Sequence, residues 1–234
     1  MTILTIVQDV ANESQLFEPP TSLVANQNKE AKQSLSFLKT VSEELLRMHA
    51  WEDLTREQTF VTDGTGSYAI STIVTDNDYD RPYNGTEWDR SNQKMVQFVT
   101  PQEWQDLKSG IVTNTGIYRF ARVRGGNMLM TPDASGDTVA FEYVSNFYAK
   151  SSGGTRKATY SDDSDTSAYP EDLLKLGLKY YLKTEYGLPA TEDSFRYYDT
   201  IDSLMAQDAP AKIIRPKRQT SRFIVNIPDS GAGQ

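Results

Sequence analysis

Hydrophobic residues near the start of the chain recur with the spacing of amphipathic helices. A first helix is predicted to follow Thr2, a suitable N-cap, and to end before Pro19. A second, longer helix is predicted over residues 28–49, with charged side chains off its apolar face. The apolar positions that define the two helices are Ile3, Ile6, Val7 and Val10, followed by Leu38, Val41, Leu45 and Met48.

Two further helices are predicted near the C-terminal end. The first begins at Pro170 and is closed by Gly187, because Pro suits a helix start and Gly the position after its end. The second is capped by Thr191 and ended by Pro210. Its predicted buried face consists of Phe195, Tyr198, Ile201 and Met205.

The middle of the chain alternates with the period of two that is typical of β-strands. Strands at 59–61 and 68–70 flank Asp63-Gly64-Thr65-Gly66, which predicts a β-hairpin. Thr100-Pro101-Gln102-Glu103 is a capping box and predicts a short helix ending at Gly110. The other predicted strands are 95–99, 117–123, 127–131, 138–145 and 146–150.

Three segments have the composition of loops. Residues 76–85 are polar, and residues 151–167 are rich in Ser, Gly, Asp and Thr, so we expect the second to be a long mobile loop. Residues 211–234, called the C-terminal tail below, contain two prolines and one β-prone run at 223–227. On its own, this tail is expected to be extended or disordered.

The order of helices, then strands, then helices predicts an α+β fold. We expect a bundle of about four longer helices from both chain ends, with a β-rich middle insertion and an extended C-terminal tail. The predicted parts are a helical bundle (1–54 and 168–210), a β-rich insertion with one short helix (55–150), a long polar loop (151–167) and the C-terminal tail (211–234).

Charge divides the chain into an acidic body and a basic tail. The net charge is −8 at pH 7, which argues against a nucleic-acid binder that works by broad phosphate neutralisation. Residues 161–208 hold eleven acidic and four basic side chains, whereas the C-terminal tail holds five cations and one acid, Asp229. The two regions are therefore expected to meet different surfaces.

The composition also excludes several classes of protein. No stretch approaches the roughly 20 apolar residues that span a bilayer, and residues 1–10 lack the Lys and Arg expected of a signal or transit peptide. The chain has no cysteine, which excludes disulfides and thiolate zinc sites and is compatible with a reducing cytosol.

No catalytic constellation is evident in the sequence. His49 is the one histidine, and at the end of a helix it is expected to interact with the helix dipole. No Gly-x-Ser-x-Gly elbow or Gly-Lys-Ser/Thr phosphate loop is present. We predict no catalytic, cofactor-binding or metal-binding residues and no cofactor.

One stretch comes close to a calcium loop. Asp76, Asp78 and Asp80 alternate, and Glu87 occupies the twelfth position, but Arg81 stands where the motif requires Gly. We therefore expect a solvated acidic loop here. Asp162, Asp163 and Asp165 form a second acidic cluster that is also expected to be solvated.

Glycoside hydrolysis remains an alternative, because paired carboxylates are brought together in space rather than in sequence. Trp51 and Trp104 adjoin predicted helices, so we expect them in the core, whereas Trp88 is the best candidate for an exposed aromatic.

The C-terminal tail is the remaining candidate site. Its cations and Phe223 could stack on nucleic acid, or its β-prone run could add as a strand to a partner's sheet. The acidic body and the alternating run favour a protein partner. The candidate binding residues are Lys212, Ile213, Ile214, Arg215, Lys217, Arg218, Arg222, Phe223, Ile224, Val225 and Ile227.

The order of several short motifs resembles the head-tail connector (adaptor, or head-completion) proteins of tailed bacteriophages. The motifs that carry the resemblance are Met1-Thr2-Ile3-Leu4, Trp51-Glu52-Asp53-Leu54, Thr86-x-Trp88-x-Arg90, Thr100-Pro101-Gln102-Glu103-Trp104, Tyr118-Arg119-Phe120, Phe141-Glu142-Tyr143-Val144-Ser145 and Glu171-Asp172-Leu173-Leu174. They cover most of the chain up to about Asp208. The chain departs from the family pattern at 73–80 and at 151–167.

The resemblance implies a structural, non-enzymatic virion protein, assembled in the host cytoplasm. Such subunits form a ring, commonly of twelve copies, beneath the portal protein, which their C-terminal tails contact. The opposite face receives the phage tail or its nozzle protein, and double-stranded DNA passes through the bore without specific binding. An acidic bore would let DNA slide, and the candidate residues facing it are Asp162, Asp163, Asp165, Glu171 and Asp172.

Two alternatives to this ring subunit remain open. One is a glycan-acting hydrolase with paired carboxylates and an exposed aromatic. The other is a monomeric module that binds peptides or sugars, which would not need the basic tail.

Overall fold

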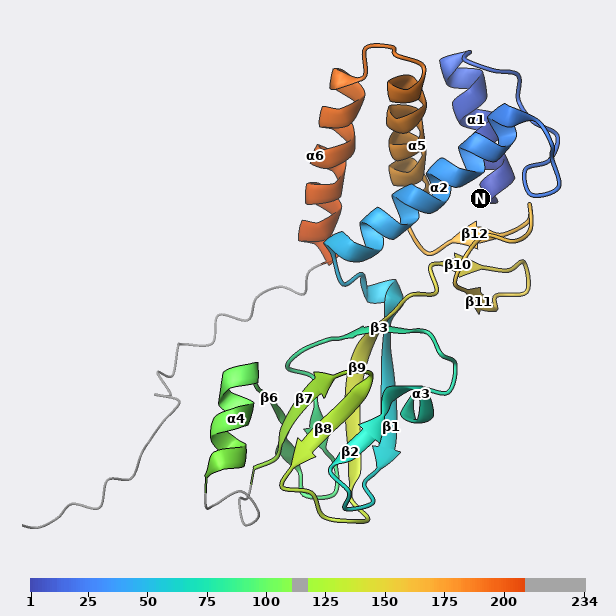
Figure 1. The fold of residues 1–234 in the computed structure, drawn as a ribbon. Coiled ribbons are helices and arrows are strands. Elements are labelled where there is room, and N and C mark those ends of the chain that lie inside the picture. The colour runs from blue at the N-terminus through green and yellow to red at the C-terminus, as the bar shows by residue number, and fades with distance from the viewer. Residues whose placement is uncertain (111–117, 209–234) are drawn as a thin grey trace, which may run out of the picture.

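The chain folds into a helical part and a β part that lie end to end (Figure 1). The computed structural model describes residues 1–110 and 118–208. The predicted C-terminal tail and residue 117 lie outside these ranges. The protein is mixed α+β, as predicted. No helix in the described ranges has an apolar run long enough to cross a membrane.

Six α-helices and one short 3₁₀ helix, η1, occur in the described residues. They are α1 (Ile3–Ser14), α2 (Lys29–Met48), η1 (Glu52–Leu54), α3 (Ile70–Ile73), α4 (Pro101–Ser109), α5 (Glu171–Glu185) and α6 (Thr191–Asp208). The caps follow the sequence signals: the Thr2 side chain accepts a hydrogen bond from the Thr5 amide, and Thr100 and Glu103 form the predicted capping box.

Helix α5 packs against α1, α2 and α6 and so unites the helical part. The core between these helices contains Ile6, Leu38, Leu178 and Ile201, all almost fully buried. Gly177 of α5 allows the closest approach. A Cβ at this position would lie 2.8 Å from Val41 Cγ1 of α2 and 2.9 Å from Tyr197 Cε2 of α6. Glycine is therefore required by packing here.

Twelve strands form three sheets within the described residues. They are β1 (Thr55–Val61), β2 (Ser67–Ala69), β3 (Tyr79–Pro82), β4 (Trp88–Asp89), β5 (Lys94–Met95), β6 (Gln97–Phe98), β7 (Phe120–Arg124), β8 (Asn127–Thr131), β9 (Thr138–Ser145), β10 (Ala149–Lys150), β11 (Arg156–Lys157) and β12 (Thr166–Ser167). One sheet has the order β1-β9-β4-β5 with β3 also on β9, a second β2-β8-β7-β6 and a third β11-β10-β12.

Strand β9 connects the two hydrophobic cores of the protein. Its Phe141 and Tyr143 side chains belong to the core of the β part, together with Phe60 of β1 and Met128 of β8. Val144 belongs to the core of the helical part. Successive side chains of a strand point to opposite faces. Near the end of β9, Tyr143 therefore packs in the core of the β part and Val144 in the core of the helical part.

The predicted hairpin at Asp63–Gly66 is wrong. Strand β1 pairs along its whole length with β9, and β2 pairs with β8, so the two strands belong to different sheets. Gly64 and Gly66 do adopt positive φ angles, but the turn carries the chain from one sheet to the other. Thr62 fixes the crossing, since its amide donates to the Asp137 carbonyl at 2.8 Å.

Other predicted boundaries also change. The strand predicted at 95–99 divides into β5 and β6, which lie in different sheets, and Ile70 begins α3 rather than ending a strand. The polar segment 76–85 contains β3, which pairs with β9. The strands predicted at 127–131 and 138–145 are confirmed.

The segment 151–167, predicted to be a long loop, contains β11 and β12 and forms a small sheet with β10. Tyr160, its one large aromatic residue, is 1% exposed, and its hydroxyl is hydrogen-bonded to Ser42 of α2 at 2.8 Å. Figure 1 shows this sheet beneath α1. The polar composition of this segment gave no sign that Tyr160 would attach it to the core of the helical part.

The buried face of α6 differs from the predicted one. Asp193, Tyr197 and Ile201 are buried, whereas Phe195 is 71% exposed and Tyr198 41% exposed. Ile201 is common to the predicted and the observed face. Tyr197 takes the buried position because its ring packs beside Gly177.

We predict that Gly177→Ala lowers the free energy of unfolding by about 1–2 kcal/mol. The new methyl group forces Val41 and Tyr197 apart, and this strain exceeds the roughly 1 kcal/mol that alanine gains in helix propensity. Urea denaturation measures the change. Thr184→Ala, on an exposed position of the same helix, is the control, with an expected change below about 0.5 kcal/mol. Equal stability of the two variants would contradict this account of the packing.

Candidate functional site

The stretch from Asp76 to Glu87 is only in part the solvated loop expected, because Asp78 and Glu87 are buried whereas Asp76 and Asp80 are exposed. Asp78 is fully buried, and its carboxylate lies 2.7 Å from Arg56 Nη1, 2.7 Å from the Tyr143 hydroxyl and 2.7 Å from the Ser145 hydroxyl. Burial, and then the hydrogen bond to Asp78, raises the pKa of Tyr143 to about 12. In the described part of the chain, no group of three or more acidic or His side chains could hold a metal ion.

Glu87 lies apart from this cluster and is also buried. Its Oε2 accepts a hydrogen bond from the Gly85 amide at 2.8 Å. Burial raises the pKa of its carboxyl group. The side chain that would be the twelfth ligand of a calcium loop is thus turned into the protein.

His49 lies at the junction between the helical part and the β part. Its Nε2 is 3.1 Å from an Asp208 carboxylate oxygen, and its ring contacts Trp51 edge-on. The same Asp208 oxygen accepts a hydrogen bond from the Glu52 amide at 3.0 Å. Within the described residues no serine hydroxyl is hydrogen-bonded to this imidazole. His49 therefore joins the end of α6 to the end of α2.

The C-terminal end of α2 is bound by side chains from beyond the helix. Arg81 of β3 donates to the carbonyls of Leu46 at 2.8 Å and His49 at 3.0 Å. Trp51 Nε1 donates to the Leu45 carbonyl at 2.9 Å. A helix leaves its last carbonyls without partners, and a cation is favoured there. These bonds hold the β part against the helical part.

Most of the acids predicted to face a bore have partners inside the folded chain. Asp165 is fully buried, and its two oxygens lie 2.6 and 2.7 Å from Lys157 Nζ, so the solvated cluster expected here is wrong for this residue. Asp163 accepts hydrogen bonds from the Leu23 and Val24 amides.

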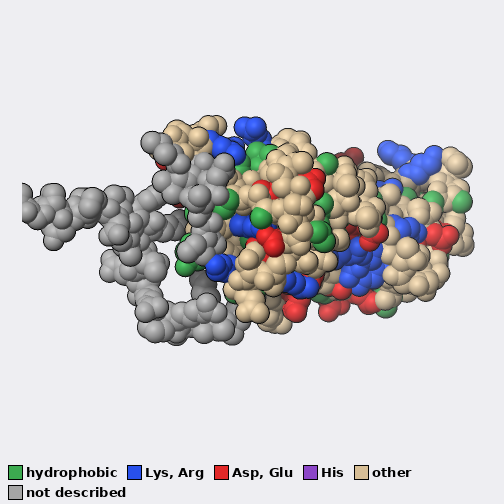
Figure 2. Space-filling view, turned by 90° about the horizontal axis from the view of Figure 1, so that it is seen from below, with side chains coloured by type: hydrophobic (Ala, Val, Ile, Leu, Met, Phe, Trp, Pro, Cys, Tyr) green, Lys and Arg blue, Asp and Glu red, His purple; other side chains and the backbone are tan. Residues whose placement is uncertain are grey.

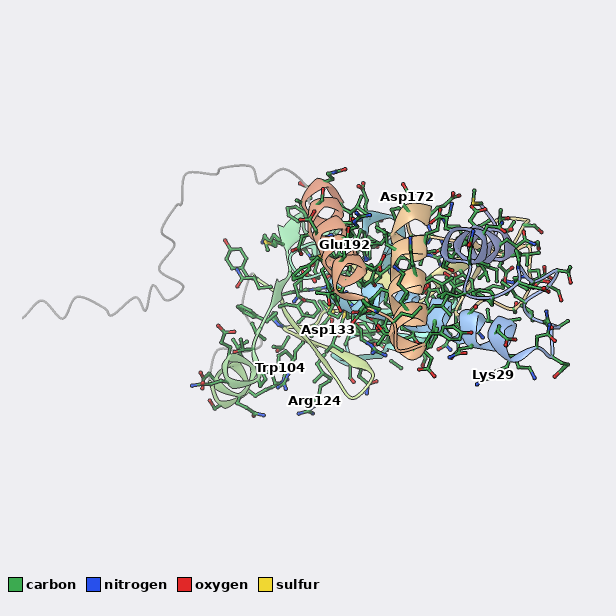
Figure 3. All side chains as sticks on the ribbon, turned by 90° about the horizontal axis from the view of Figure 1, so that it is seen from above. Lys29, Trp104, Arg124, Asp133, Asp172 and Glu192 are labelled. Atoms are coloured by element: carbon green, nitrogen blue, oxygen red, sulfur yellow. The ribbon has the colours of Figure 1, made fainter. Side chains whose placement is uncertain are left out.

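The remaining three candidates lie nearer the surface. Glu171 binds the amino group of Met1. Asp162 and Asp172 are exposed, and Asp172 lies at the start of α5 (Figure 3). Hydrogen bonds from Ser164 lower the pKa of Asp162. Asp162 and Asp172 are thus the candidates whose side chains are exposed to solvent.

The tail residues predicted to bind a partner, from Lys212 to Ile227, lie outside the described residues. The described chain ends at Asp208, which is hydrogen-bonded at the junction. The last described residue therefore lies at the junction between the helical part and the β part (Figure 1).

One motif of the predicted resemblance has a structural role in the β part. Arg119 is 7% exposed, with its Nε 3.2 Å from an Asp89 carboxylate oxygen and its Nη2 bound to Asp137. Two carboxylates around one guanidinium satisfy the charge that burial would otherwise make costly. This ion-pair group ties β4 to the strands of the neighbouring sheet.

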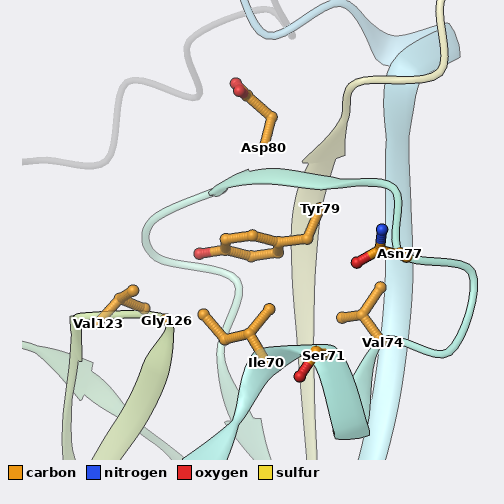
Figure 4. Close-up of a pocket in the computed structure, with 8 residues that line it drawn as sticks. All are labelled: Ile70, Ser71, Val74, Asn77, Tyr79, Asp80, Val123 and Gly126. Atoms are coloured by element: carbon orange, nitrogen blue, oxygen red, sulfur yellow. The ribbon is translucent and has the colours of Figure 1, made fainter. Parts of the chain in front are cut away.

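Two pockets in the described part of the chain lack the pair of carboxylates beside a Trp that the glycan-acting alternative would use. Trp51 and Trp104 are buried and Trp88 is 45% exposed, as predicted. A pocket of about 450 Å³ lies between α3, β3 and the β7–β8 turn, with Tyr79 across it (Figure 4). Of the residues that line it, Asp80 is the one carboxylate, and it pairs with Arg81. A second pocket between α5 and α6 contains no carboxylate and no Trp.

The face seen from below carries no large field of one charge. Lys and Arg side chains alternate there with Asp and Glu, and hydrophobic side chains are scattered among them (Figure 2). The more distinctive surfaces are the outer faces of α2 and α6. Phe195 and Tyr198 make the α6 face aromatic as well as acidic, a feature that the sequence-based assignment of its buried face concealed.

No family model matches the chain, and no curated protein matches it.

We predict that Arg81→Met lowers the free energy of unfolding by about 2–3 kcal/mol. The substitution keeps an unbranched apolar stem but removes two charge-assisted hydrogen bonds and leaves the Leu46 and His49 carbonyls without their side-chain donor. Urea denaturation measures the loss. Arg90→Met is the matched control, because its exposed pair with Glu57 contributes at most about 1 kcal/mol. Equal losses in the two variants would show that Arg81 does not hold the junction.

The Asp165 carboxylate predicts a specific acid dependence. Burial raises its pKa, but hydrogen bonds from Lys157 and the Ser161 and Asp162 amides outweigh burial and leave the pKa below its ordinary value. The stability it contributes is therefore present above about pH 4, the pKa of an unfolded Asp, and is lost as the pH falls through the lowered pKa.

We expect the difference in melting temperature between the native chain and Asp165→Asn to be largest near neutral pH and to shrink below about pH 4. Thermal unfolding between pH 2 and pH 7 measures it. Glu18→Gln, at an exposed position, serves as control. A difference that stays constant over this range would rule out a folded-state role for the ionised carboxylate.

Proposed function

We propose that the chain is a structural subunit of the ring that joins head and tail in a tailed bacteriophage. In this proposal, α1, α2, α5 and α6 form a four-helix bundle, and the β part is an insertion that projects from it. The ring docks beneath the portal protein, receives the phage tail or nozzle on its opposite face and lets double-stranded DNA pass through its bore. The subunit performs no chemistry.

The observation that carries this proposal is the position of Asp208. This residue joins α6 to both His49 and Glu52 at the junction. The basic C-terminal tail follows this junction closely in sequence, whereas the body that precedes it is acidic. A tail of this charge favours a partner other than the body itself. The resemblance to the connector family also supports the proposal, because its motifs occur in both the helical part and the β part.

Docking is proposed to work by strand addition. The run 223–227 would pair with an open sheet edge of the portal, and the five cations would steer the tail to an acidic surface and seat it. Because ordering the tail costs entropy that only binding offsets, ring formation is linked to the presence of the portal. The exposed carboxylates of Asp162 and Asp172 are the remaining candidates for the bore, where they would repel phosphate.

Electron cryo-microscopy of the chain mixed with the portal protein of the virus that encodes it tests this function. We expect a ring docked through residues 211–234. Deletion of these residues abolishes docking while leaving the melting temperature of the folded body unchanged. An intact chain that does not bind the portal would exclude the proposed function.

Two matched tail variants separate the proposed contributions. One replaces the five cations with Gln and keeps the β-prone run, so we expect slower association and a weaker salt dependence. The other carries Phe223→Asp and Val225→Asp and keeps the cations, so we expect faster dissociation. Equal kinetics for both variants would argue against strand addition steered by charge.

A further inference from the structure

The outer face of α6 has the residue spacing of a helix-packing seam. Its exposed residues follow one another at intervals of three and four, which places them in one line along the helix. They lie opposite the buried residues Tyr197 and Ile201. This acidic seam consists of Glu192, Phe195, Asp199, Asp202 and Ala206.

The outer face of α2 has the same spacing and the opposite charge. Its residues also follow at intervals of three and four, on the side away from Leu38 and Leu45. This basic seam consists of Lys29, Lys32, Ser36, Lys39, Glu43 and Arg47, all of them exposed except the partly buried Lys39.

Four of the eight charges in the two seams have no partner in the described part of the chain, whereas Glu192, Glu43, Arg47 and Lys32 do. Within residues 1–110 and 118–208, Lys29 and Lys39 form no ion pair, and neither do Asp199 and Asp202. Phe195, at the upper end of the acidic seam, leaves 71% of its surface in water. Phe195 lies one helical turn from the unpaired carboxylate of Asp199, so this face offers a partner an apolar contact and a charge side by side.

The two seams lie on different helices, which meet at their C-terminal ends, where His49 contacts Asp208, and diverge towards the start of α2. Helix α6 lies at one end of the helical part, and Lys29, at the start of α2, lies towards the other end (Figure 3). A contact between two different surfaces of identical subunits is heterologous, and its repetition closes a ring when the rotation between neighbours divides a full turn. A pair of identical patches would instead stop at a dimer.

We propose that the acidic seam of α6 in one copy packs against the basic seam of α2 in the next copy. This inference rests on the proposed function, because it supplies the two complementary faces that a ring of identical subunits requires. Phe195 packs against the aliphatic stems of the lysines, while their ammonium groups pair with Asp199 and Asp202. The partner of each seam is thus a second copy of this chain.

Zero-length coupling of carboxylates to amines tests the contact in the intact protein. Equal amounts of ¹⁴N- and ¹⁵N-labelled full-length chain are mixed, alone and with the portal, and treated with a carbodiimide. We expect mixed-isotope peptides that join Asp199 or Asp202 to Lys32 or Lys39. Mixed peptides that join Asp199 or Asp202 to Lys212 or Lys217 instead would overturn the proposal, because the C-terminal tail would then occupy the acidic seam.

Charge exchange gives a second, independent test. One variant carries Asp199→Lys and Asp202→Lys, and the other carries Lys32→Glu and Lys39→Glu. Each variant alone opposes like charges at every contact, so we expect assembly to weaken about 10-fold or more. In a mixture, the two variants alternate with complementary charges at every contact, and assembly returns. Alternation closes a ring only if the number of copies is even.

Two controls isolate the contact from folding and from net charge. Glu18→Lys with Asp106→Lys makes the same charge change at exposed positions elsewhere, and should leave assembly unchanged. Phe195→Ala should weaken assembly without lowering the melting temperature, because the Phe195 side chain is already exposed to solvent in the single subunit.

The outcomes separate this inference from the proposed function. A ring that assembles on the portal equally well from all variants would overturn the seam contact and leave the ring function standing. A native chain that neither binds the portal nor yields mixed-isotope peptides would exclude both.

Discussion

The relation between the two halves of the protein depends on the carbonyl groups at the C-terminal end of α2. A helix cannot satisfy these groups itself. Trp51 binds the Leu45 carbonyl from the segment that follows the helix, and Arg81 reaches the Leu46 carbonyl from β3. The β part thus completes the helix, and the direction in which it projects follows from this bonding. Strand β9 then extends from one core to the other beneath the same junction.

Local signals in the sequence predicted the ends of elements well but not their partners. The capping box before α4 and the proline before α5 determine where these helices begin, because the bonds involved lie within four residues. The pairing of β1 with β9 joins residues that are 77 positions apart at Val61 and Thr138 and 89 apart at Thr55 and Val144. The alternation of a strand contains no information on its partner. The hairpin at Asp63–Gly66 was predicted because its two strands are close in sequence. In the structure these strands pair with β9 and β8 instead of with each other.

The surfaces were predicted less well than the fold, for a physical reason visible in α6. This helix has aromatic residues on two sides, Tyr197 on one and Phe195 on the other, and either set matches helical spacing. The choice between the two sides depends on the space beside Gly177, which belongs to α5. The sequence of α6 alone gives no information on that space. Likewise, the acidic residues of segment 151–167 looked solvated, because nothing local shows that Asp165 faces Lys157.

The bonds of Asp208 also bear on how the protein carries mechanical load. A pull on the chain beyond this residue reaches His49 and Glu52 at once, through one carboxylate. The force therefore divides between the ends of two helices and the start of the β part instead of peeling α6 from its last turn. In a protein held in this way, tension on α6 is passed through Asp208 to the end of α2 and to the start of η1.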